Sequence, residues 1–486
     1  MNTVDNFKRA LKWIDQNSLP NAGIAVSSDN KRAYPEVSGY FIPTLLSWNE
    51  KDRAISYGRW LLKAQHPEGC WGDPNENIPY AFDTGQILKG LLALSKDTKT
   101  QEWDEAIRNA SNWLQKQIGS GGEPIAPDKL AWGDGVPLGV LLYSFEALKR
   151  AGEQFGEQGW VDSANQVIEW FLSQSNLTSF THLSHFHAYI LEALCDLGHE
   201  TRAREGMIVV EKLQKKNGSV PGFQDVRWVC STGLFQYAIV WYKLGDANRA
   251  EAAFKYAVGL QNKSGGWFGS YGWRKKYFPK SEISWAVKYY LDALRHRLIS
   301  SFEKMAPIFS EIIDREDGRY QLISKQIQSS RAINILDAGC GKGRYLRNLA
   351  NDFPALALYG SDLSANVMES IPENVMLKQG SLLNLPYQDK YFDFVYAVES
   401  LEHAVHTHGA LKELMRVLRP GGKLVIIDKN ANSLGKMSLP DWEQWFESNQ
   451  LVGMIKLLGA EVEVVENVPY EGKADGLFTA WIASKA

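Results

Sequence analysis

Hydrophobic residues recur at three- and four-residue spacing over most of the first 300 positions, and this spacing predicts one helix after another. The segments that show it are 7–16, 53–65, 82–96, 102–117, 136–152, 160–174, 186–198, 201–216, 232–245, 247–261 and 282–296. Alternation of apolar and polar residues, which marks a half-buried strand, is nearly absent from this part. We therefore expect residues 1–299 to form an all-α domain.

A short motif recurs where several of these segments end. Each reads a glutamine followed by a Gly-rich turn, in "QHPEGCW", "QIGSGGEP", "QKKNGSVPGF" and "QNKSGGWFGS". Gln65–Trp71 and Gln261–Trp267 both match Q-x-x-x-G-x-W. A period of about 40 to 57 residues with two helices per unit indicates stacked helical hairpins, and six such hairpins can close into a ring.

On this repeat, residues 1–299 resemble the α/α toroids of terpenoid cyclases and of six-hairpin glycosidases, lyases and epimerases. The resemblance implies an inner and an outer circle of helices, with the loops that enter the inner helices lining a central cavity. The acidic D-x-D-D motif of squalene–hopene cyclases is not found in the sequence. Its absence argues against triterpene cyclisation.

The loops of the expected toroid carry the candidates for a ligand site. They are Tyr80, Asp83, Trp132, Asp134, His185, His187, Trp228 and Glu282, with Arg227 beside them. Aromatic faces and carboxylates are the groups with which proteins bind and process sugars. The alternative is structural, because aspartate before a helix is commonly an N-cap and tryptophan in a helical array is commonly core. The toroid is expected to bind or scaffold rather than to catalyse.

The pattern changes near residue 300. Residues 300–329 read as a helical linker, and beyond them apolar strands alternate with helices. The expected strands are 333–339, 355–362, 375–381, 392–400 and 422–429, and the expected helices are 343–352, 364–371 and 409–418. This alternation predicts a doubly wound, Rossmann-like α/β domain over residues 330–486, with its ligand site at the carboxyl ends of the strands.

The first turn of this domain, "LDAGCGKGRY", is rich in glycine. Gly339, Gly341 and Gly343 allow a sharp bend and a close approach of the backbone to a ligand. The spacing is G-x-G-x-G, whereas a dinucleotide loop normally reads G-x-G-x-x-G. Asp362 ends the next strand, where a carboxylate can accept both hydroxyls of a ribose. A dinucleotide such as NAD is therefore a weak candidate for the cofactor.

Together with "GSLLNLPYQDKYFDFVYAVESLEH", "LRPGGKLVIIDK" and the closing "AEVEVVENVPY" and "GLFTAWIASKA", these segments resemble class I S-adenosylmethionine-dependent methyltransferases. The subgroup is the one that methylates small molecules, quinones and sugars. The resemblance covers about residues 330–486. It implies methyltransferase activity, S-adenosylmethionine as the cofactor, and a terminal antiparallel strand pair that dehydrogenases lack.

The resemblance also implies the cofactor contacts. They involve Asp337, Gly339, Gly341, Gly343, Asp362, Leu363, Ser381, Leu382, Val398 and Glu399. Asp337 is expected near the amino group of the cofactor, Asp362 at its ribose, and Glu399 beside the sulfonium. Ser381 departs from the pattern, because relatives usually carry aspartate there. That departure leaves the strength of adenine binding in doubt.

Methyl transfer depends mainly on in-line positioning of the nucleophile, although a neutral alcohol benefits from a base. Glu402, His403 and His406 follow the fourth strand and are the catalytic candidates. His403 is the expected base or substrate orienter, since histidine titrates near neutrality. The alternative is that "LEH" only begins a helix. A divalent metal on these histidines is an alternative that the resemblance leaves open, because some sugar methyltransferases depend on a metal, but no second carboxylate is clearly placed and no metal site is predicted. A substrate-side cap is expected from Asp441, Trp442 and Trp445.

The composition of the chain excludes some classes of binding partner and favours one class of methyl acceptor. The net charge of −3 gives no reason to expect nucleic acid or an anionic membrane. No apolar run reaches the roughly 18 residues of a membrane span, and the four isolated cysteines suit a reducing compartment, so a cytoplasmic location is expected. Fourteen of the 17 tryptophans precede residue 300. The favoured acceptor is therefore a carbohydrate hydroxyl. The alternatives are a terpenoid or polyketide acceptor, or a toroid that is a protein-interaction scaffold.

Overall fold

The computed structural model describes residues 2–73, 78–125, 128, 133–435 and 439–486. The chain forms two compact units. One comprises Lys8–Leu46 and Glu50–Arg297, and the other comprises the N-terminal residues up to Phe7 together with Ser47–Asn49 and Leu298–Ala486. No helix in the described part of the chain is long and apolar enough to cross a membrane.

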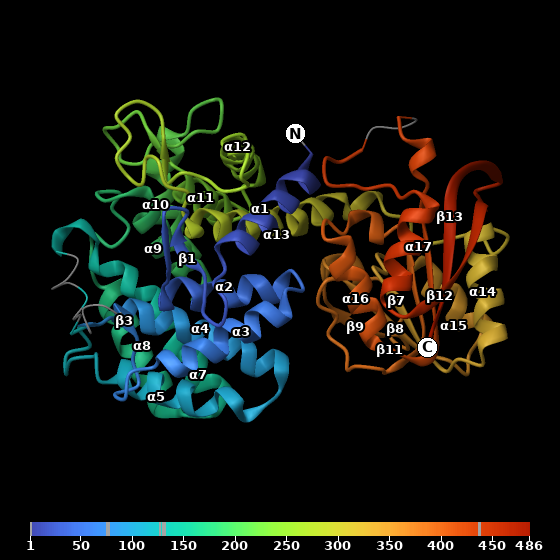
Figure 1. Ribbon diagram of the computed structural model, residues 1–486, viewed down its shortest axis with the longest axis horizontal. Helices are drawn as coiled ribbons and strands as arrows, with labels where there is room; N and C mark the ends of the chain where they lie inside the picture. The colour runs from blue at the N-terminus through green and yellow to red at the C-terminus, as the bar shows by residue number, and fades with distance from the viewer. Residues whose placement is uncertain (1, 74–77, 126–127, 129–132, 436–438) are drawn as a thin grey trace. The chain divides into compact units, whose positions relative to one another are not determined.

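The first unit is built from helical hairpins (Figure 1). Its inner helices are α2 (Pro35–Ser47), α4 (Ala81–Thr98), α7 (Leu142–Phe155), α9 (Ser184–Asp196), α11 (Ser231–Lys243) and α13 (Ser284–Met305). Its outer helices are α3 (Lys51–Ala64), α5 (Asp104–Gln115), α8 (Gln158–Leu172), α10 (Glu200–Leu213), α12 (Ala247–Val258) and α1 (Thr3–Asn17). Each inner helix from α4 to α11 contacts the next inner helix and its own outer partner.

The inner helices close into a circle through α2 and α13. The Thr44 hydroxyl of α2 donates a hydrogen bond to Asp292 Oδ1 of α13 at 2.7 Å. Gly39 brings α2 so close to α4 that a Cβ there would lie 2.7 Å from the Ile87 Cα. On the other side, the Phe235 ring of α11 lies 5.6 Å from a tyrosine ring of α13. The predicted α/α toroid is confirmed.

The repeated glutamine motif stabilises the turns, and in its first copy it joins one outer helix to the next. Gln65 Nε2 donates to the carbonyl of Gly69 at 2.9 Å and to the carbonyl of Ala106 on α5 at 3.0 Å. Trp71 Nε1 donates at 3.0 Å to a carbonyl of α3, the helix before the turn. Equivalent intraturn and tryptophan bonds, at 2.9 and 2.8 Å, recur in the second copy at 261–267. The tryptophans of the motif therefore have a structural role.

Helix α2 was missed by the sequence pattern. Almost all of its residues are buried, so it has no polar face to produce a three- and four-residue period. It also contains Gly39 and Pro43, which normally weaken or kink a helix interior. Its surroundings in the inner circle override both signals.

The second unit contains a seven-stranded sheet. Its strands are β7 (Asn334–Ala338), β8 (Ala357–Asp362), β9 (Met376–Gln379), β10 (Phe392–Val398), β11 (Leu418–Lys429), β12 (Ala460–Tyr470) and β13 (Lys473–Lys485). Their order is β12-β13-β11-β10-β7-β8-β9. The strands from β7 to β11 are parallel, whereas β13 runs antiparallel to both β11 and β12. The predicted parallel sheet with a terminal antiparallel pair is confirmed.

Helices cover the sheet on both faces, as an all-buried parallel sheet requires. Alternate residues of the strands share one buried core with α14 (Gly318–Ser330) and α15 (Arg344–Asp352). The strands also contact α16 (Thr407–Val417) and α17 (Ser448–Leu457), which touch each other (Figure 1). The helix predicted at 364–371 is wrong. Only a short 3-10 turn, Asn366–Met368, forms there, because Pro372 follows and disfavours helical backbone before it.

Candidate cofactor and acceptor site

The Gly-rich loop joins β7 to α15 in a tight fold. Gly339, Gly341 and Gly343 have φ angles of 84°, 50° and 72°, in the left-handed region that favours glycine. The N–H of Gly339 donates to the carbonyl of Ser361 at 2.8 Å, which holds the loop against β8. A Cβ on Gly339 would lie 2.4 Å from the Cβ of Ser400. The loop therefore requires glycine at its first position.

Asp362 closes the other side of the loop. Its Oδ2 accepts a hydrogen bond from the backbone N–H of Gly341 at 2.9 Å, and its Oδ1 accepts one from Ser364 at 3.0 Å. Burial raises the pKa of Asp362 above its ordinary value. These bonds fix the position of Asp362 relative to the Gly-rich loop. The two elements expected to contact the cofactor therefore lie side by side.

These elements open into a cavity of about 400 Å³ at the carboxyl ends of the parallel strands. The cofactor candidates that line it are Asp337, Gly339, Gly341, Asp362, Leu363, Ser381, Leu382, Val398 and Glu399. The remaining one, Gly343, caps the start of α15 and is not among the lining residues. Glu402 and His403 line the same cavity, so the sequence-predicted cofactor and catalytic residues are brought together.

The surroundings of Asp337 show whether the site suits S-adenosylmethionine. Asp337 is only 2% exposed, and within the described part of the chain its Oδ2 has no hydrogen-bond partner. Burial raises the pKa of Asp337 to about 8, and a side-chain hydrogen bond with Tyr396 and the charge of Arg344 offset only part of that rise. An ammonium group would supply the missing partner and favour the carboxylate form. The amino group of S-adenosylmethionine meets that need, so the residues present fit the cofactor.

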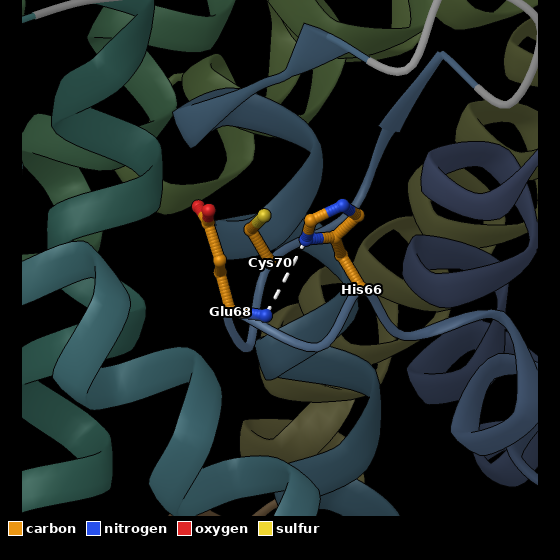
Figure 2. Close-up of side chains that lie close together, drawn as sticks. All are labelled: His66, Glu68 and Cys70. Atoms are coloured by element: carbon orange, nitrogen blue, oxygen red, sulfur yellow. Dashed lines mark hydrogen bonds between the residues drawn. The ribbon is translucent and has the colours of Figure 1, made fainter.

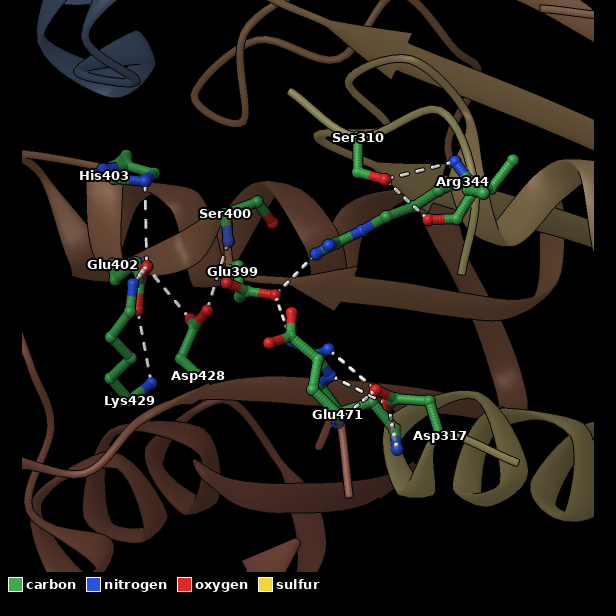
Figure 3. Close-up of polar contacts among 12 residues, drawn as sticks. Ser310, Asp317, Arg344, Glu399, Ser400, Glu402, His403, Asp428, Lys429 and Glu471 are labelled. Atoms are coloured by element: carbon green, nitrogen blue, oxygen red, sulfur yellow. Dashed lines mark hydrogen bonds and ion pairs between the residues drawn. The ribbon is translucent and has the colours of Figure 1, made fainter. Parts of the chain in front are cut away.

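Glu399, expected beside the sulfonium, is already held by two guanidinium groups. Its Oε1 lies 2.5 Å from Arg344 Nη2 and 2.6 Å from Arg319 Nη1 (Figure 3). Burial alone would raise the pKa of Glu399, but these arginines and Lys429 bring it below its ordinary value. Sequence reasoning missed Arg344, although its place directly after the last glycine of the loop was a usable signal.

A network of buried charges supports the far end of the cavity. Lys429, at the end of β11, is ion-paired with Glu402 (Figure 3). It also lies 3.2 Å from Glu443. Burial raises the pKa of Glu402 to about 7, while Lys429 opposes that rise. Asp428 accepts hydrogen bonds from the N–H of Glu402 at 3.2 Å and from that of Ser400 at 3.1 Å. Glu402 is therefore anchored as part of the framework.

His403 stands above this network. Its Nε2 lies 3.7 Å from Glu402 and its Nδ1 lies 3.8 Å from Glu443, and Nδ1 has no hydrogen-bond partner in the described ranges. Its ring meets that of Phe302 edge-on at 5.3 Å. Burial lowers the pKa of His403 to about 4, so the imidazole is uncharged at neutral pH. An uncharged ring that is not tied up in a hydrogen bond can accept a proton.

His406 is not brought to the cavity. Its Nδ1 bonds the carbonyl of Trp48 at 2.9 Å, and its ring lies 5.5 Å from that of Phe7. The exposed His408, in the first turn of α16, is not a lining residue either. Ser381 does line the cavity, but its hydroxyl accepts a hydrogen bond from the N–H of Leu383 at 3.1 Å. Its oxygen therefore has a local role beside the one expected toward adenine.

Apolar side chains form the remaining wall of the cavity. They are Trp48, Leu298, Phe302, Ile308 and Phe309. Sequence reasoning missed all five, because they come from segments far from the methyltransferase motifs and carry no local signal. Of the expected cap residues, Trp442 has its ring 6.3 Å from that of Phe302, and Trp445 Nε1 donates to Glu443 at 2.7 Å.

The toroid candidates separate into two groups. Asp83 and His185 line a cavity of about 270 Å³ within the first unit. The others described are held in structural contacts or exposed. Glu282 accepts a bond from Trp13 Nε1 at 2.7 Å, and His187 bonds the Tyr237 hydroxyl at 2.9 Å. Tyr80 and Trp228 are buried but do not line the cavity, and Asp134 is exposed. Trp132 lies outside the described residues.

Two groups of metal-ligand side chains occur among the described residues. In the first, His66 Nδ1 accepts a bond from the N–H of Glu68 at 3.3 Å, and burial raises the pKa of the Cys70 thiol to about 11 (Figure 2). In the second, which joins His403 to Glu402 and Glu443, the ammonium of Lys429 is paired with both carboxylates.

Comparison with known proteins agrees with this geometry. Residues 336–426 match a family model described as a methyltransferase domain. The C-terminal unit contains a class I methyltransferase domain. This match implies S-adenosylmethionine as the cofactor, in agreement with the fit of Asp337 and Asp362.

Two curated relatives align with a quarter of the chain. Tocopherol O-methyltransferase of Arabidopsis thaliana is 30% identical over 141 residues, which are 26% of this chain and 40% of that protein. O-methyltransferase resE of Aspergillus sclerotiorum is 33% identical over 143 residues, or 26% of this chain and 49% of that protein. The chain thus spans less than half of the length of each of these two relatives.

The toroid has a structural relative. A solved structure of an unsaturated glucuronyl hydrolase specific for heparin covers 62% of this chain and 97% of its own length, with a TM-score of 0.50 and 14% identity. That likeness agrees with the toroid fold of the first unit and shows the fold alone.

Proposed function

We propose that this chain is an S-adenosylmethionine-dependent O-methyltransferase whose acceptor is a carbohydrate hydroxyl, with residues 1–299 binding the substrate and residues 330–486 transferring the methyl group. The observation that carries the proposal is that the cofactor candidates and His403 line one cavity of about 400 Å³. Oxygen as the acceptor atom is supported by relatives that are named O-methyltransferases.

In the proposed reaction, the acceptor oxygen attacks the methyl carbon in line with the carbon–sulfur bond. That bond breaks, its electron pair stays on sulfur, and the hydroxyl proton passes to His403. The chain's own part is to position the two reactants and to accept this proton. Asp337 and Asp362 would hold the amino group and the ribose, while Lys429 and Glu402 would keep the loop that carries His403 in place.

The toroid supports a carbohydrate as the acceptor. Its fold is shared with a hydrolase named for heparin, and its own cavity combines aromatic rings with two buried acids. Aromatic faces and carboxyl groups are well suited to the C–H faces and hydroxyls of sugars.

One observation favours a second candidate. One wall of the C-terminal cavity, which includes Trp48, Leu298, Phe302 and Phe309, is apolar, and we call it the acceptor wall. An apolar wall would also suit a terpenoid or polyketide acceptor that carries a hydroxyl. Transfer of labelled methyl from S-adenosylmethionine to two panels, one of glycans and one of apolar alcohols, tests both. Labelling of glycans supports the proposal. Labelling of apolar alcohols alone would replace it with the second candidate.

A further inference from the structure

The first unit has a cavity of its own, about 270 Å³ in volume, at the starts of its inner helices. It is slightly smaller than the roughly 300–1,000 Å³ of pockets for drug-sized ligands, so a single sugar ring is a ligand of suitable size. Phe82, Tyr189 and Trp285 are among the aromatic residues on its walls, and Glu36 and Asp83 supply its two acids.

The two acids offer unpaired oxygens to the cavity. Glu36 is 4% exposed and Asp83 is 3% exposed. Among the described residues, neither Glu36 Oε1 nor Asp83 Oδ2 has a hydrogen-bond partner. Buried polar atoms are rarely left without a partner in folded proteins, and each unmade bond is a reason for a ligand to bind.

The charge of the cavity selects among ligands. Neither lysine nor arginine occurs among the described residues that line it. The histidine of the lining, His185, is uncharged at neutral pH, because burial lowers its pKa to about 4. The nearby ammonium of Lys288 is held 2.8 Å from Asp292. A carboxylated or sulfated sugar would therefore meet two acids and no cation facing it.

The two acids can exchange hydrogen bonds with a sugar hydroxyl. Burial raises the pKa of Glu36 to about 8 and that of Asp83 well above its ordinary value. At neutral pH the carboxyl of Glu36 is therefore mostly protonated, and it can donate one hydrogen bond and accept another. A sugar hydroxyl does the same.

We propose that this cavity binds one uncharged sugar residue, with a C–H face of the ring on the aromatic walls and its hydroxyls on the free oxygens of Glu36 and Asp83. The inference rests on the proposed carbohydrate function, and it goes further by fixing the charge class of the sugar and the pair of acids that bind it. The heparin-specific hydrolase that shares the fold is named for an acidic glycan, which this cavity would reject.

The test uses the full chain, without any methyl donor. Binding of methyl β-D-glucopyranoside, galactopyranoside and mannopyranoside is measured by saturation-transfer NMR and calorimetry, beside glucuronic acid and glucosamine. At least one uncharged glycoside is expected to bind at least ~10-fold more tightly than either charged sugar. Tighter binding of glucuronic acid or glucosamine, or no binding of the three uncharged glycosides, would overturn the proposal.

Two substitutions of similar size test the role of Glu36. Glu36→Gln keeps a donor and an acceptor, so affinity should stay within ~3-fold, whereas Glu36→Met removes both and should weaken binding ~10-fold. Glu68→Gln, an exposed change in the same unit, is the control. Equal loss in both Glu36 variants would contradict a protonated Glu36 that both donates a hydrogen bond to the sugar and accepts one from it.

The same samples separate failure of this inference from failure of the methyltransferase. Thermal unfolding confirms that each variant is folded, and Asp83→Asn provides a second amide variant expected to retain binding. Calorimetry with S-adenosylhomocysteine reports on the C-terminal unit alone. Binding of S-adenosylhomocysteine without sugar binding contradicts only the inference about the cavity, and the converse result contradicts only the methyltransferase.

Discussion

The carboxylate of Asp362 accepts a hydrogen bond from the backbone N–H of Gly341 at 2.9 Å. This contact joins the end of β8 to the Gly-rich loop after β7, although the two residues are 21 positions apart. Both line the cavity that also contains His403. The contact therefore brings together the two motifs on which the cofactor assignment depends.

Replacement of Gly339 by alanine should impair cofactor binding. Its φ of 84° costs an L-residue about 1–2 kcal/mol, and the new Cβ would meet the Ser400 Cβ at 2.4 Å, so the loop must move. We expect the affinity for S-adenosylhomocysteine to fall at least ~10-fold by calorimetry. Gly421→Ala is the control, since its φ is 73° and a Cβ added there would have nothing within 4 Å of it. Equal affinities for the two variants would contradict the role of the loop.

Cofactor binding should strengthen as pH rises. The pKa of Asp337 is about 8 in the free protein, so the carboxyl is mostly protonated at pH 6 to 7. An ammonium partner favours the ionised form and lowers the pKa in the complex, so binding releases a proton. The affinity for S-adenosylhomocysteine should therefore rise between pH 6 and 8 and level off above 8, with a heat that depends on the ionisation enthalpy of the buffer. In Asp337→Asn this slope should vanish. A slope that persists there would assign the proton to another group.

His403 should affect the chemical step and leave cofactor binding intact. General-base catalysis typically contributes about 10²–10⁴-fold, so His403→Gln should lower kcat in that range while S-adenosylhomocysteine binds as before. His408→Gln, an exposed change five residues further along in the first turn of α16, is the matched control. Because the pKa of His403 is about 4, the rate should not fall from protonation of this ring until pH drops below about 5. Unchanged turnover in His403→Gln would leave this residue a structural role only.

The stability of the toroid should depend on the glycine in its repeated turn. Gly265 has a φ of 102°, and a Cβ there would lie 2.0 Å from the carbonyl oxygen of Arg9. Strain of about 1–2 kcal/mol and overpacking of about 1–3 kcal/mol predict that Gly265→Ala loses about 2–5 kcal/mol of unfolding free energy. Gly198→Ala, with a φ of 79° and open space, should lose only the strain. Tryptophan fluorescence during urea unfolding measures both. A loss no larger than that of Gly198→Ala would contradict the structural role of the repeat.

Residues whose role is local were predictable from the sequence. The outer helices have one polar face, and the Gly-rich loop and Asp362 lie at fixed places relative to strands, so spacing alone located them. The Q-x-x-x-G-x-W repeat was also visible, and its explanation lies in the bonds of Gln65 to Gly69 and to the next outer helix.

Residues that act through tertiary contact were not predictable. Helix α2 lacks a polar face, so its pattern has no helical period, and Glu36 in its first turn was missed with it. Trp48 and Phe302 reach the acceptor wall from distant segments. His406 looked equivalent to His403 in sequence, yet it bonds the Trp48 carbonyl and does not line the cavity. Position along a loop does not determine which side chains face a cavity.

The most direct measurement is calorimetric titration of the full chain with S-adenosylhomocysteine, beside Asp362→Ala and the exposed control Asp475→Ala. The account predicts one site per chain in the wild type and in the control, and a loss of at least ~100-fold in Asp362→Ala, because both ribose hydroxyls lose a buried acceptor. Absence of binding by the wild type, or equal binding by Asp362→Ala, would contradict the assignment of this cavity to the methyl donor.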